Sequence, residues 1–424
     1  MNRRELIKGL GMGAASLPFL SMAMTVSPSM PEWKEFFTDD KVKDEAFWKK
    51  FKKDYYDVSK EFINLENGFF GVQPIPVYKA YLKNIERLNQ FSSKYLRTEY
   101  GADLKAIMKQ LAEFSGVSDE ELLITRNATE AMNIIINGLD LKAGDEVILH
   151  KQDYYSMIEA FEMLEKQKGI KIKVIRVPLL PKNDEEIISK YEAAVTSRTK
   201  CILTTHMIHL TGQIMPVKKI ADTFKPRGID VIVDAAHSFA QVDYKLGDLN
   251  CDFVGVNLHK WFGNPLGAGL LYVKKDRIKD LKPMFGDSAK EDNDIKKLGH
   301  FGTLSVPIVM TIPESKKFND MVTIPLKEKR LRYLQNYWTK EAKGIPKVNV
   351  TTPDDPKRSC AIASFAIEGM KTEDVIRGLL EKHNVFTVIR HLEDQDVVRV
   401  TPNLYNNTGE MDVLLEGLND LAKS

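Results

Sequence analysis

Residues 253–269 have the sequence FVGVNLHKWFGNPLGAG, and this stretch decides the fold. Its first five residues are mostly apolar and predict a strand that is buried on both faces. His259, Lys260 and Trp261 follow the strand end, just before a turn rich in glycine and proline. Lysines are rarely buried, and an amine held among apolar and cationic neighbours has a lowered pKa and can form a Schiff base. Lys260 is therefore the first candidate for a reactive side chain, and an ordinary surface lysine is the alternative.

Short β-rich runs alternate with helical stretches on both sides of this segment. The predicted strands are 122–125, 146–150, 172–177, 201–205, 230–234, 253–257 and 269–273, and the predicted helices include 156–168, 184–195 and 218–224. This alternation indicates an α/β fold with a mostly parallel sheet covered on both faces. Residues beyond about 310 predict a smaller α+β domain, with strands 362–367, 386–389 and 397–401 and helix 372–383. We expect a helical segment at 24–60, a large domain at 61–310 and a small domain at 311–424.

Residues 1–23 have the features of an export signal of the twin-arginine (Tat) type. Arg3 and Arg4 begin a charged start, a weakly apolar stretch rich in glycine and alanine follows, and Ser21 and Ala23 offer small residues at a cleavage site. We therefore expect recognition by the Tat export machinery and a periplasmic location. An ordinary basic N-terminus is the alternative interpretation.

The composition argues against several classes of partner. The formal net charge is +2 and no basic stripe interleaved with aromatic residues is present, so nucleic acid is not an expected partner. No apolar run reaches the roughly 20 residues that span a bilayer, so no membrane association is expected after signal removal. Cys201, Cys251 and Cys360 lack metal-ligand spacing, and no metal site is predicted.

Asp234 ends the predicted strand 230–234, whose preceding residues are valine and isoleucine. A carboxylate that closes a buried strand is costly unless it has a cationic partner, and a protonated pyridine nitrogen would be one. A helix-capping aspartate is the alternative. Asp234 precedes Lys260 by one β-α-β excursion, which can bring both strand ends to one crevice.

Two other strand ends carry candidate cofactor contacts. Asn127, Ala128 and Thr129 begin a helix after strand 122–125, where backbone N–H groups and a hydroxyl suit a phosphate. An ordinary capped helix is the alternative reading of these residues. Tyr154 follows strand 146–150 and could stack on a flat ring, with neighbouring Tyr155 as the second choice. Both tyrosines could instead be simple packing residues.

The order of these motifs resembles the class V aminotransferase family of fold type I enzymes, which use pyridoxal 5′-phosphate (PLP), and within it the isopenicillin N epimerase-like proteins. The stretches that carry the resemblance are 257–261 with Pro265, Gly267 and Gly269, then 125–133, 64–71, 205–212, 301–303, 399–402 and 405–408. The likeness covers about residues 60–420. It implies a large PLP-binding domain with a mostly parallel sheet, a smaller α+β domain and a homodimer with sites at the interface.

The resemblance also implies a role for individual residues. Lys260 would be the Schiff-base lysine and proton shuttle, and Asp234 would pair with the pyridine N–H. Tyr154 would stack on the ring and His237 would lie near the ring oxygen. The phosphate contacts would be Ala128, Thr129, His259 and, across the dimer, Thr303. The substrate contacts would be Asn67, in the loop 64–71, and Arg399, whose bidentate fork suits a carboxylate.

Three positions depart from the family pattern. Leu304 and Ser305 follow Thr303 where the family often has Arg-Asp, and His209 stands where asparagine is common. The segment 389–395 has no cysteine, which disfavours a cysteine desulfurase because its persulfide nucleophile is absent.

The expected substrate is an amino acid, a peptide or a secondary-metabolite amine that reacts at its α-amino centre. PLP makes the Cα–H acidic, and the fate of that proton decides between epimerisation, transamination and elimination. The motifs alone do not choose among these reactions. An aminotransferase or an epimerase-like enzyme is the leading reading, and a PLP-dependent lyase that cleaves C–S bonds is the alternative. A non-catalytic binding protein that keeps the fold is a third possibility.

Overall fold

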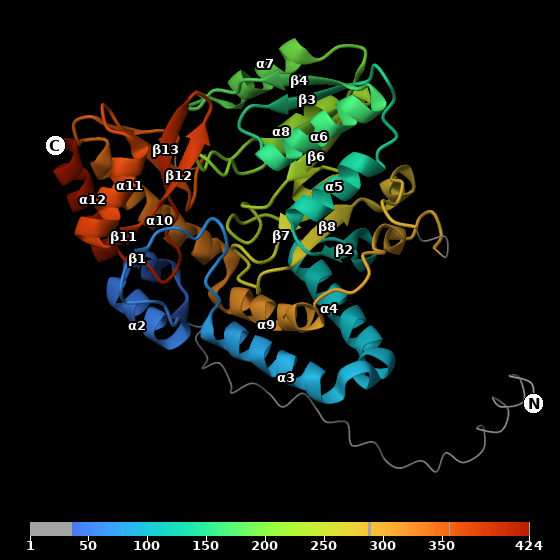
Figure 1. Ribbon diagram of the computed structural model, residues 1–424, viewed down its shortest axis with the longest axis horizontal. Helices are drawn as coiled ribbons and strands as arrows, with labels where there is room; N and C mark the ends of the chain where they lie inside the picture. Colours follow the sequence, from blue (N-terminus) through green and yellow to red (C-terminus); the bar gives the residue numbers. More distant parts are fainter. Residues whose placement is uncertain (1–35, 287–289, 356, 424) are drawn as a thin grey trace, which may run out of the picture. The chain divides into compact units, whose positions relative to one another are not determined.

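The computed structural model describes residues 36–286, 290–355 and 357–423 (Figure 1). The α-helices are α2 (Glu45–Tyr55), α3 (Ile75–Thr98), α4 (Tyr100–Ser115), α5 (Ala128–Gly138), α6 (Tyr155–Lys168), α7 (Asp184–Ala194), α8 (Val217–Phe224), α9 (Val306–Val322), α10 (Ile324–Ala342), α11 (Thr372–His383) and α12 (Thr408–Lys423). The strands are β1 (Ile63–Asn64), β2 (Leu122–Thr125), β3 (Glu146–His150), β4 (Lys171–Ile175), β5 (Thr199–Thr205), β6 (Asp230–Asp234), β7 (Phe253–Asn257), β8 (Gly269–Val273), β9 (Val348–Val350), β10 (Ala363–Ile367), β11 (Val385–Phe386), β12 (Val388–Leu392) and β13 (Gln395–Val400). The 3₁₀ helices are η2 (Asp39–Lys43), η3 (Asp119–Glu121), η4 (Lys225–Arg227), η5 (Leu246–Leu249), η6 (Lys275–Asp280) and η7 (Ile295–Leu298). The predicted export signal, 1–23, lies outside the described residues.

The central sheet has the strand order β2-β8-β7-β6-β5-β3-β4. The pairs from β4 through β7 are parallel, and β8 runs antiparallel to both of its neighbours, β2 and β7. The prediction of an α/β fold with a mostly parallel sheet is therefore confirmed. The carboxyl ends of β3, β5, β6 and β7 meet at one edge, where open α/β sheets bind their ligands.

The predicted strands match this sheet closely. Strands 122–125, 146–150, 230–234, 253–257 and 269–273 have the predicted bounds. β4 ends at Ile175 rather than at residue 177, because the last residue of β3, His150, pairs with Ile175. β5 begins at Thr199 rather than at residue 201, because Glu146 of β3 pairs with Thr199.

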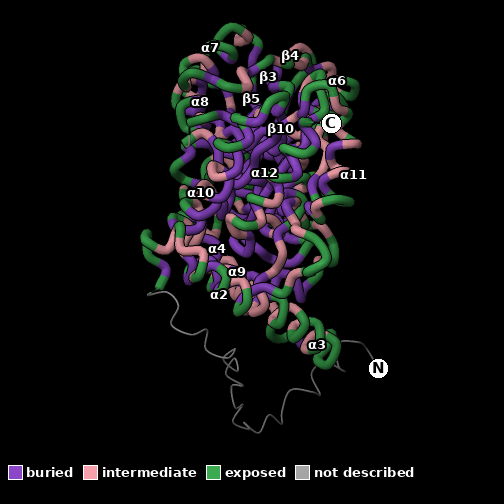
Figure 2. Tube along the Cα trace, turned by 90° about the vertical axis from the view of Figure 1, so that its left-hand side faces the viewer, coloured by how far each residue is buried: buried purple, intermediate pink, exposed green. Residues whose placement is uncertain are grey.

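Helices cover both faces of the central sheet, so its strands are largely buried, except for the edge strand β4, whose residues are exposed or half-buried (Figures 1 and 2). Val147 and Leu149 of β3 belong to the buried cluster that contains α5 and α6. Ile148, whose side chain points the opposite way, belongs to the cluster with α4, α7 and α8. Successive strand residues face opposite sides of a sheet, which explains why these strands are apolar throughout rather than alternating.

A second, antiparallel sheet has the order β12-β13-β10-β9 and packs with α10, α11 and α12. Helix 372–383 is confirmed as α11, and the strand predicted at 362–367 is β10, which begins one residue later, at Ala363. The single strand predicted at 386–389 is two separate strands, β11 and β12, which pair with different partners. β13 begins at Gln395, earlier than predicted, because it forms a tight hairpin with β12 through the pair Leu392 and Gln395.

Residues 63–66 pair with segments from the C-terminal part of the chain. Ile63 of β1 pairs with Val385 of β11, and Glu66 forms a bridge with Thr401. This pairing carries the loop 64–71 to the edge of the central sheet, where the Gly71 N–H donates to the His259 carbonyl over 3.0 Å.

The structure can be compared with the domain bounds expected from the sequence at the N-terminal segment and at the boundary near residue 310. The described part of segment 24–60 contains η2 and α2, and the α2 side chains of Trp48, Phe51 and Tyr55 are buried. The division placed between residues 310 and 311 falls inside α9. Within the described residues, no helix has the length and apolar character needed to cross a membrane.

Candidate active site

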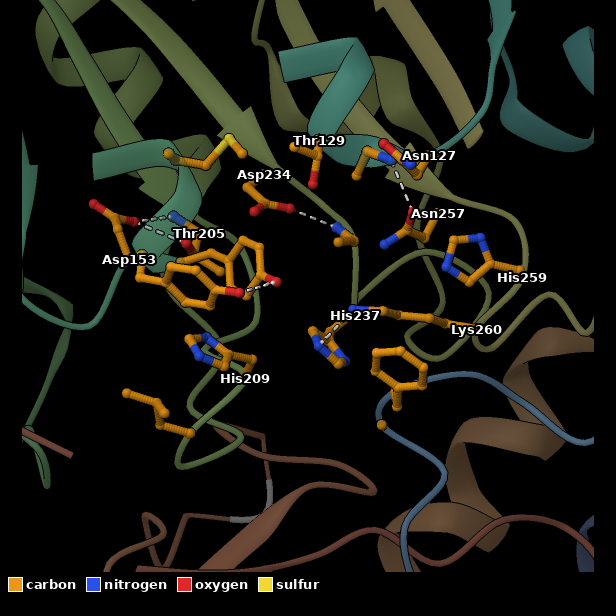
Figure 3. A pocket seen from close by; sticks show the side chains of 18 of the residues that line it. Asn127, Thr129, Asp153, Thr205, His209, Asp234, His237, Asn257, His259 and Lys260 are labelled. Carbon is orange, nitrogen blue, oxygen red and sulfur yellow. Dashed lines mark hydrogen bonds between the residues drawn. The ribbon is translucent and has the colours of Figure 1, made fainter. Parts of the chain in front are cut away.

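A cavity of about 1190 Å³ opens at the carboxyl ends of the central strands, between them and the β12–β13 hairpin. The predicted site residues that line it are Ala128, Thr129, Tyr154, Asp234, His237, His259, Lys260, Thr303 and Arg399. Figure 3 shows that several of these side chains converge from different strand ends. The fold thus brings together residues that span most of the chain.

Lys260 lies at the turn after β7, and its amine points toward His237. The Lys260 Nζ and the His237 Nε2 are 2.9 Å apart. Burial lowers the pKa of the Lys260 amine to about 7, while the Asp234 carboxylate opposes this shift. A large fraction of the amine is therefore unprotonated near neutral pH, the form that attacks a carbonyl carbon.

Asp234 is a buried carboxylate at the end of β6. Its Oδ1 accepts a hydrogen bond from the Ala236 N–H over 2.9 Å, the one hydrogen bond to this carboxylate within the described part of the chain. Burial raises the pKa of Asp234 to about 6. A buried carboxylate without an ion-pair partner is ready for a cationic ligand. The pyridine nitrogen of PLP, when protonated, carries the positive charge that could pair with this carboxylate.

The start of α5 lines the cavity and forms a cradle in which a phosphate could lie. The Asn127 side chain caps the helix by accepting from the Glu130 N–H over 2.8 Å, and Asn257 Oδ1 accepts from the Ala128 N–H over 2.8 Å. The Thr129 hydroxyl faces the cavity. A Cβ added to Gly269 would lie 2.5 Å from the backbone of Asn127, so the close approach of β8 to this helix requires glycine. Because the Ala128 and Glu130 N–H groups already donate to these side chains, the Thr129 hydroxyl and the positive end of the helix dipole are what this turn offers a phosphate group.

His259 completes the cradle in a defined orientation. Its Nδ1 lies 3.0 Å from the Ala268 carbonyl oxygen, which can only accept, so Nδ1 carries a proton. Burial lowers the pKa of His259 to about 4, which leaves Nε2 without a proton in the free protein. A bound phosphate dianion would raise that pKa and favour the imidazolium, whose Nε2–H could then donate to it.

Arg399 of β13 is buried beside a carboxylate that the sequence did not identify. Its Nη2 and Nε donate to Glu66, the latter over 3.4 Å, and its Nη1 donates to the His209 carbonyl over 3.0 Å. Arg390 of β12 donates to the same Glu66 over 3.2 Å and also lines the cavity. Two guanidinium groups against one carboxylate leave one positive charge in excess. This cluster of Glu66, Arg390 and Arg399 can therefore take up one substrate carboxylate.

Asn67 was predicted to contact substrate, and the structure places its amide elsewhere. The side chain is fully buried and does not line the cavity. Its Nδ2 donates to the Thr401 carbonyl over 2.8 Å, and its Oδ1 accepts from the Tyr405 hydroxyl over 2.7 Å. Both ends of the amide are thus used in packing the loop 64–71, and the loop residues that face the cavity are Gly68 and Phe69.

Gly68 supplies the space that the carboxylate cluster needs. A Cβ at this position would lie 2.7 Å from Arg399 Nη2. We expect Gly68→Ala to displace the guanidinium and to lower kcat/KM by about tenfold to a hundredfold, since misplacing a binding group by about an ångström has costs of this order. The measurement is kcat/KM with an α-amino acid substrate, compared with the matching amine that lacks the carboxylate.

The matched control is Gly101→Ala in α4, where an added Cβ meets nothing within 4 Å. We expect this variant to behave like the wild type with both compounds. Equal values for Gly68→Ala and Gly101→Ala with the carboxylate substrate would contradict the role given to Arg399.

Tyr154 lies at the start of α6 with its ring against His209. The two ring centroids are 5.2 Å apart and the planes are nearly perpendicular, at 89°. The preceding residue, Asp153, anchors the turn, because its Oδ1 accepts from the Thr205 N–H over 2.9 Å and from the Thr205 hydroxyl over 2.8 Å. Tyr155 also lines the cavity but is largely exposed. The structure thus favours Tyr154 as the more fixed of the two aromatic faces.

The loop before α9 forms a further part of the cavity wall. Thr303, which the resemblance assigns to a neighbouring subunit's phosphate, lines the cavity of its own chain together with Leu304 and Ser305. The cysteines Cys201, Cys251 and Cys360 are all buried away from the cavity lining, and burial raises the pKa of each thiol. No group of His, Cys, Asp and Glu side chains with metal-ligand geometry occurs within the ranges that the structure describes.

A lysine at one strand end, an unpaired buried carboxylate at the next and a phosphate cradle at a helix start define a PLP-dependent enzyme of fold type I. The family model for aminotransferase class-V matches residues 75–412, and the chain belongs to this family. PLP is therefore its cofactor. When bound, PLP supplies the electron sink that makes bonds at Cα of an amino acid labile.

The comparisons with individual proteins agree with this assignment. Isopenicillin N epimerase of Streptomyces clavuligerus is 26% identical over 377 residues, which cover 85% of this chain and 95% of that protein. A probable cysteine desulfurase of Methanothermobacter thermautotrophicus is 26% identical over 385 residues, covering 82% and 92%. The cystine C–S lyase C-DES, solved with its product cysteine persulfide, has a TM-score of 0.76 at 19% identity and covers 86% of this chain and 98% of its own. A second C-DES structure holds glycine covalently linked to PLP.

Proposed function

We propose that the protein acts at the α-amino centre of an amino acid or peptide that has a free α-carboxylate, removing and returning the Cα proton. The observation that carries this proposal is that Lys260 lines the same cavity as Arg390 and Arg399, the two arginines that share Glu66. One part of the cavity can hold a carboxylate while another holds a base. An α-amino acid has a carboxylate for the first part and, on the adjacent Cα, a proton for the base to remove.

Each of these side chains has a task in that reaction. Arg399 and Arg390 bind the carboxylate and orient the substrate, because a guanidinium matches both oxygens of a carboxylate. Lys260 Nζ takes the proton from Cα and can return it, since its lowered pKa places it close to the pH at which it must act. Asp234 supplies the negative charge that keeps the cofactor nitrogen protonated.

Epimerisation or transamination is the outcome that we propose first. The likeness to isopenicillin N epimerase extends over most of both chains and supports this choice. Transamination requires only that Lys260 deliver the proton elsewhere, which the same amine can do. Neither outcome needs a cysteine at the site, in agreement with the buried positions of Cys201, Cys251 and Cys360.

C–S bond cleavage is the second candidate. Desulfurase relatives and the fold of a cystine C–S lyase support it. Because none of the cysteines lines the cavity, we propose that such a reaction would release its sulfur product directly and would not pass it to a protein thiol.

We also propose that the protein is exported through the Tat machinery and acts as a periplasmic homodimer. Arg3 and Arg4, with the small residues Ser21 and Ala23, support export. The resemblance to dimeric PLP enzymes supports the assembly. Cell fractionation and the sedimentation of the purified protein measure the two properties directly.

The experiment that tests the function is proton exchange at Cα in deuterated water. The PLP-loaded protein is incubated with a panel of L- and D-amino acids and short peptides, and the Cα–H signals are followed by NMR. Deuterium uptake with loss of optical activity indicates epimerisation, formation of an oxo acid indicates transamination, and release of pyruvate with a sulfur compound indicates C–S cleavage. A loaded protein that exchanges no Cα proton in any of these compounds, while Lys260 carries the cofactor, would contradict the proposal.

A further inference from the structure

The side chains of Trp261, His237 and Lys260 form a line of hydrogen bonds from the protein core to the cavity. The Trp261 Nε1 donates a hydrogen bond to His237 Nδ1 over 3.4 Å, and His237 Nε2 lies 2.9 Å from Lys260 Nζ. Trp261 and His237 are both buried, with 2% and 5% of their surface exposed. Water therefore has little access to the first of these contacts.

The direction of the first hydrogen bond fixes the rest of the line. An indole N–H can only donate, so His237 Nδ1 must present its lone pair to Trp261. A neutral imidazole has a single N–H, which must then be on Nε2. That N–H points at Lys260 Nζ, which has to accept the hydrogen bond. An ammonium group has no lone pair, so the accepting form of Lys260 is the neutral amine.

We propose that Trp261 is a positioning residue that sets the tautomer of His237 and thereby favours the neutral, nucleophilic form of Lys260. This inference rests on the proposed role of Lys260 as the residue that carries PLP. It gives a task to the tryptophan of the lysine motif, which touches neither the substrate cluster nor the phosphate cradle. The same tautomer keeps Nε2–H of His237 directed to the cavity as a donor.

The surrounding charges have opposing effects on Lys260, so the line of hydrogen bonds can decide between its ammonium and its neutral amine form. The charged and titratable groups that act on Lys260 or His237 are Glu66, His209, Asp234, Arg390 and Arg399. The two carboxylates favour the ammonium form of Lys260, whereas the two guanidinium groups favour the neutral amine. Burial holds the pKa of His237 well below its usual range, so its imidazole stays neutral and the tautomer argument applies.

The test is the pH dependence with which PLP adds to the cofactor-free protein. In this reaction the Nζ lone pair forms a C–N bond with the aldehyde carbon, and the aldehyde oxygen leaves as water. The rate constant, read from the visible absorbance of lysine-bound PLP, rises with pH while the amine is protonated and levels off above its pKa. The signal that remains in Lys260→Ala is subtracted to remove addition at other lysines.

We expect Trp261→Phe to move the rising part of this profile to higher pH. Without the indole N–H, His237 can place its proton on Nδ1 and accept a hydrogen bond from the Lys260 ammonium. One hydrogen bond of ordinary strength corresponds to a rate about three- to tenfold lower near neutral pH. The plateau at high pH stays unchanged, whereas a merely structural defect lowers the rate at every pH.

Two further variants make the result unambiguous. Trp338→Phe removes a buried indole whose Nε1 has no hydrogen-bond partner within the described residues, and we expect its profile to match the wild type. Replacing Trp261 with 3-benzothienylalanine exchanges the N–H for sulfur at nearly constant shape. This replacement reproduces the shift even if the phenylalanine variant folds poorly.

The pH profile of the variant with 3-benzothienylalanine in place of Trp261 decides whether the proposed role of Trp261 holds. A shift to higher pH, absent when His237→Gln is already present, supports the proposal. A profile that coincides with the wild type, or a uniform loss of rate, overturns it. If the wild-type protein forms no linkage at Lys260, the proposed role of the lysine fails instead, and the two failures are thus distinguishable.

Discussion

Lys260→Ala is expected to lose covalently bound PLP and to lower turnover by at least about a thousandfold. In the proposed function this side chain is both the point of attachment and the base at Cα, and positioned proton transfer alone contributes about a hundred- to ten-thousandfold. The variant should still fold, because within the described residues the Lys260 amine makes one hydrogen bond, to His237, and no ion pair. The measurement is turnover of an α-amino acid substrate at saturating PLP, together with the visible spectrum.

The matched control for this prediction is Lys218→Ala on the exposed side of α8. Lys218 pairs with Asp222 on the surface and does not reach the cavity. We expect its spectrum and turnover to match the wild type. Retention of most of the activity in Lys260→Ala would rule out the assignment of this residue.

Asp234→Asn is expected to lower turnover by about a hundred- to a thousandfold, the effect of removing one preorganised electrostatic contact. PLP should remain attached to Lys260, since the attachment needs only the amine. The amide that replaces the carboxylate carries no negative charge, so the protonated form of the cofactor nitrogen is no longer stabilised. The ratio of turnover to bound PLP, determined for both proteins, measures the effect.

Asp230→Asn is the control at the opposite end of the same strand. Asp230 pairs with Arg277 over 2.8 Å, away from the cavity. This variant is expected to change stability without changing turnover per bound PLP. If Asp234→Asn keeps full turnover per bound PLP, the carboxylate does not act on the cofactor.

The central sheet could be predicted from the sequence because its strands are short, apolar runs with clear ends. Lys260 and Asp234 could be named as candidates for the same reason, since they stand where buried strands stop, and the structure places both at the cavity. The smaller sheet was harder to predict. β11 and β12 are separated by Thr387 alone, and only their different pairing partners divide them into two strands.

The carboxylate cluster could be predicted only in part. Arg399 was named from its motif, but Glu66 and Arg390 join it through the pairing of distant segments, which leaves no local signal. Asn67 was assigned to substrate because it lies in the right loop. Its hydrogen bonds with Thr401 and Tyr405 exist only in the folded chain and turn its side chain away from the cavity.

The role proposed for Trp261 shows the same limit. Its position next to Lys260 is evident in the sequence, but its partner, His237, comes from the end of another strand. Tautomers follow from the direction of hydrogen bonds, and this direction requires the three-dimensional arrangement.

The most direct test of the account is to reduce the purified protein with borohydride and to map the modified peptide by mass spectrometry. We predict a visible absorbance band before reduction, loss of that band afterwards, and a single PLP-modified peptide that contains Lys260. A protein that shows no band after incubation with PLP, or a modification located at another lysine, would contradict the central claim that Lys260 carries the cofactor.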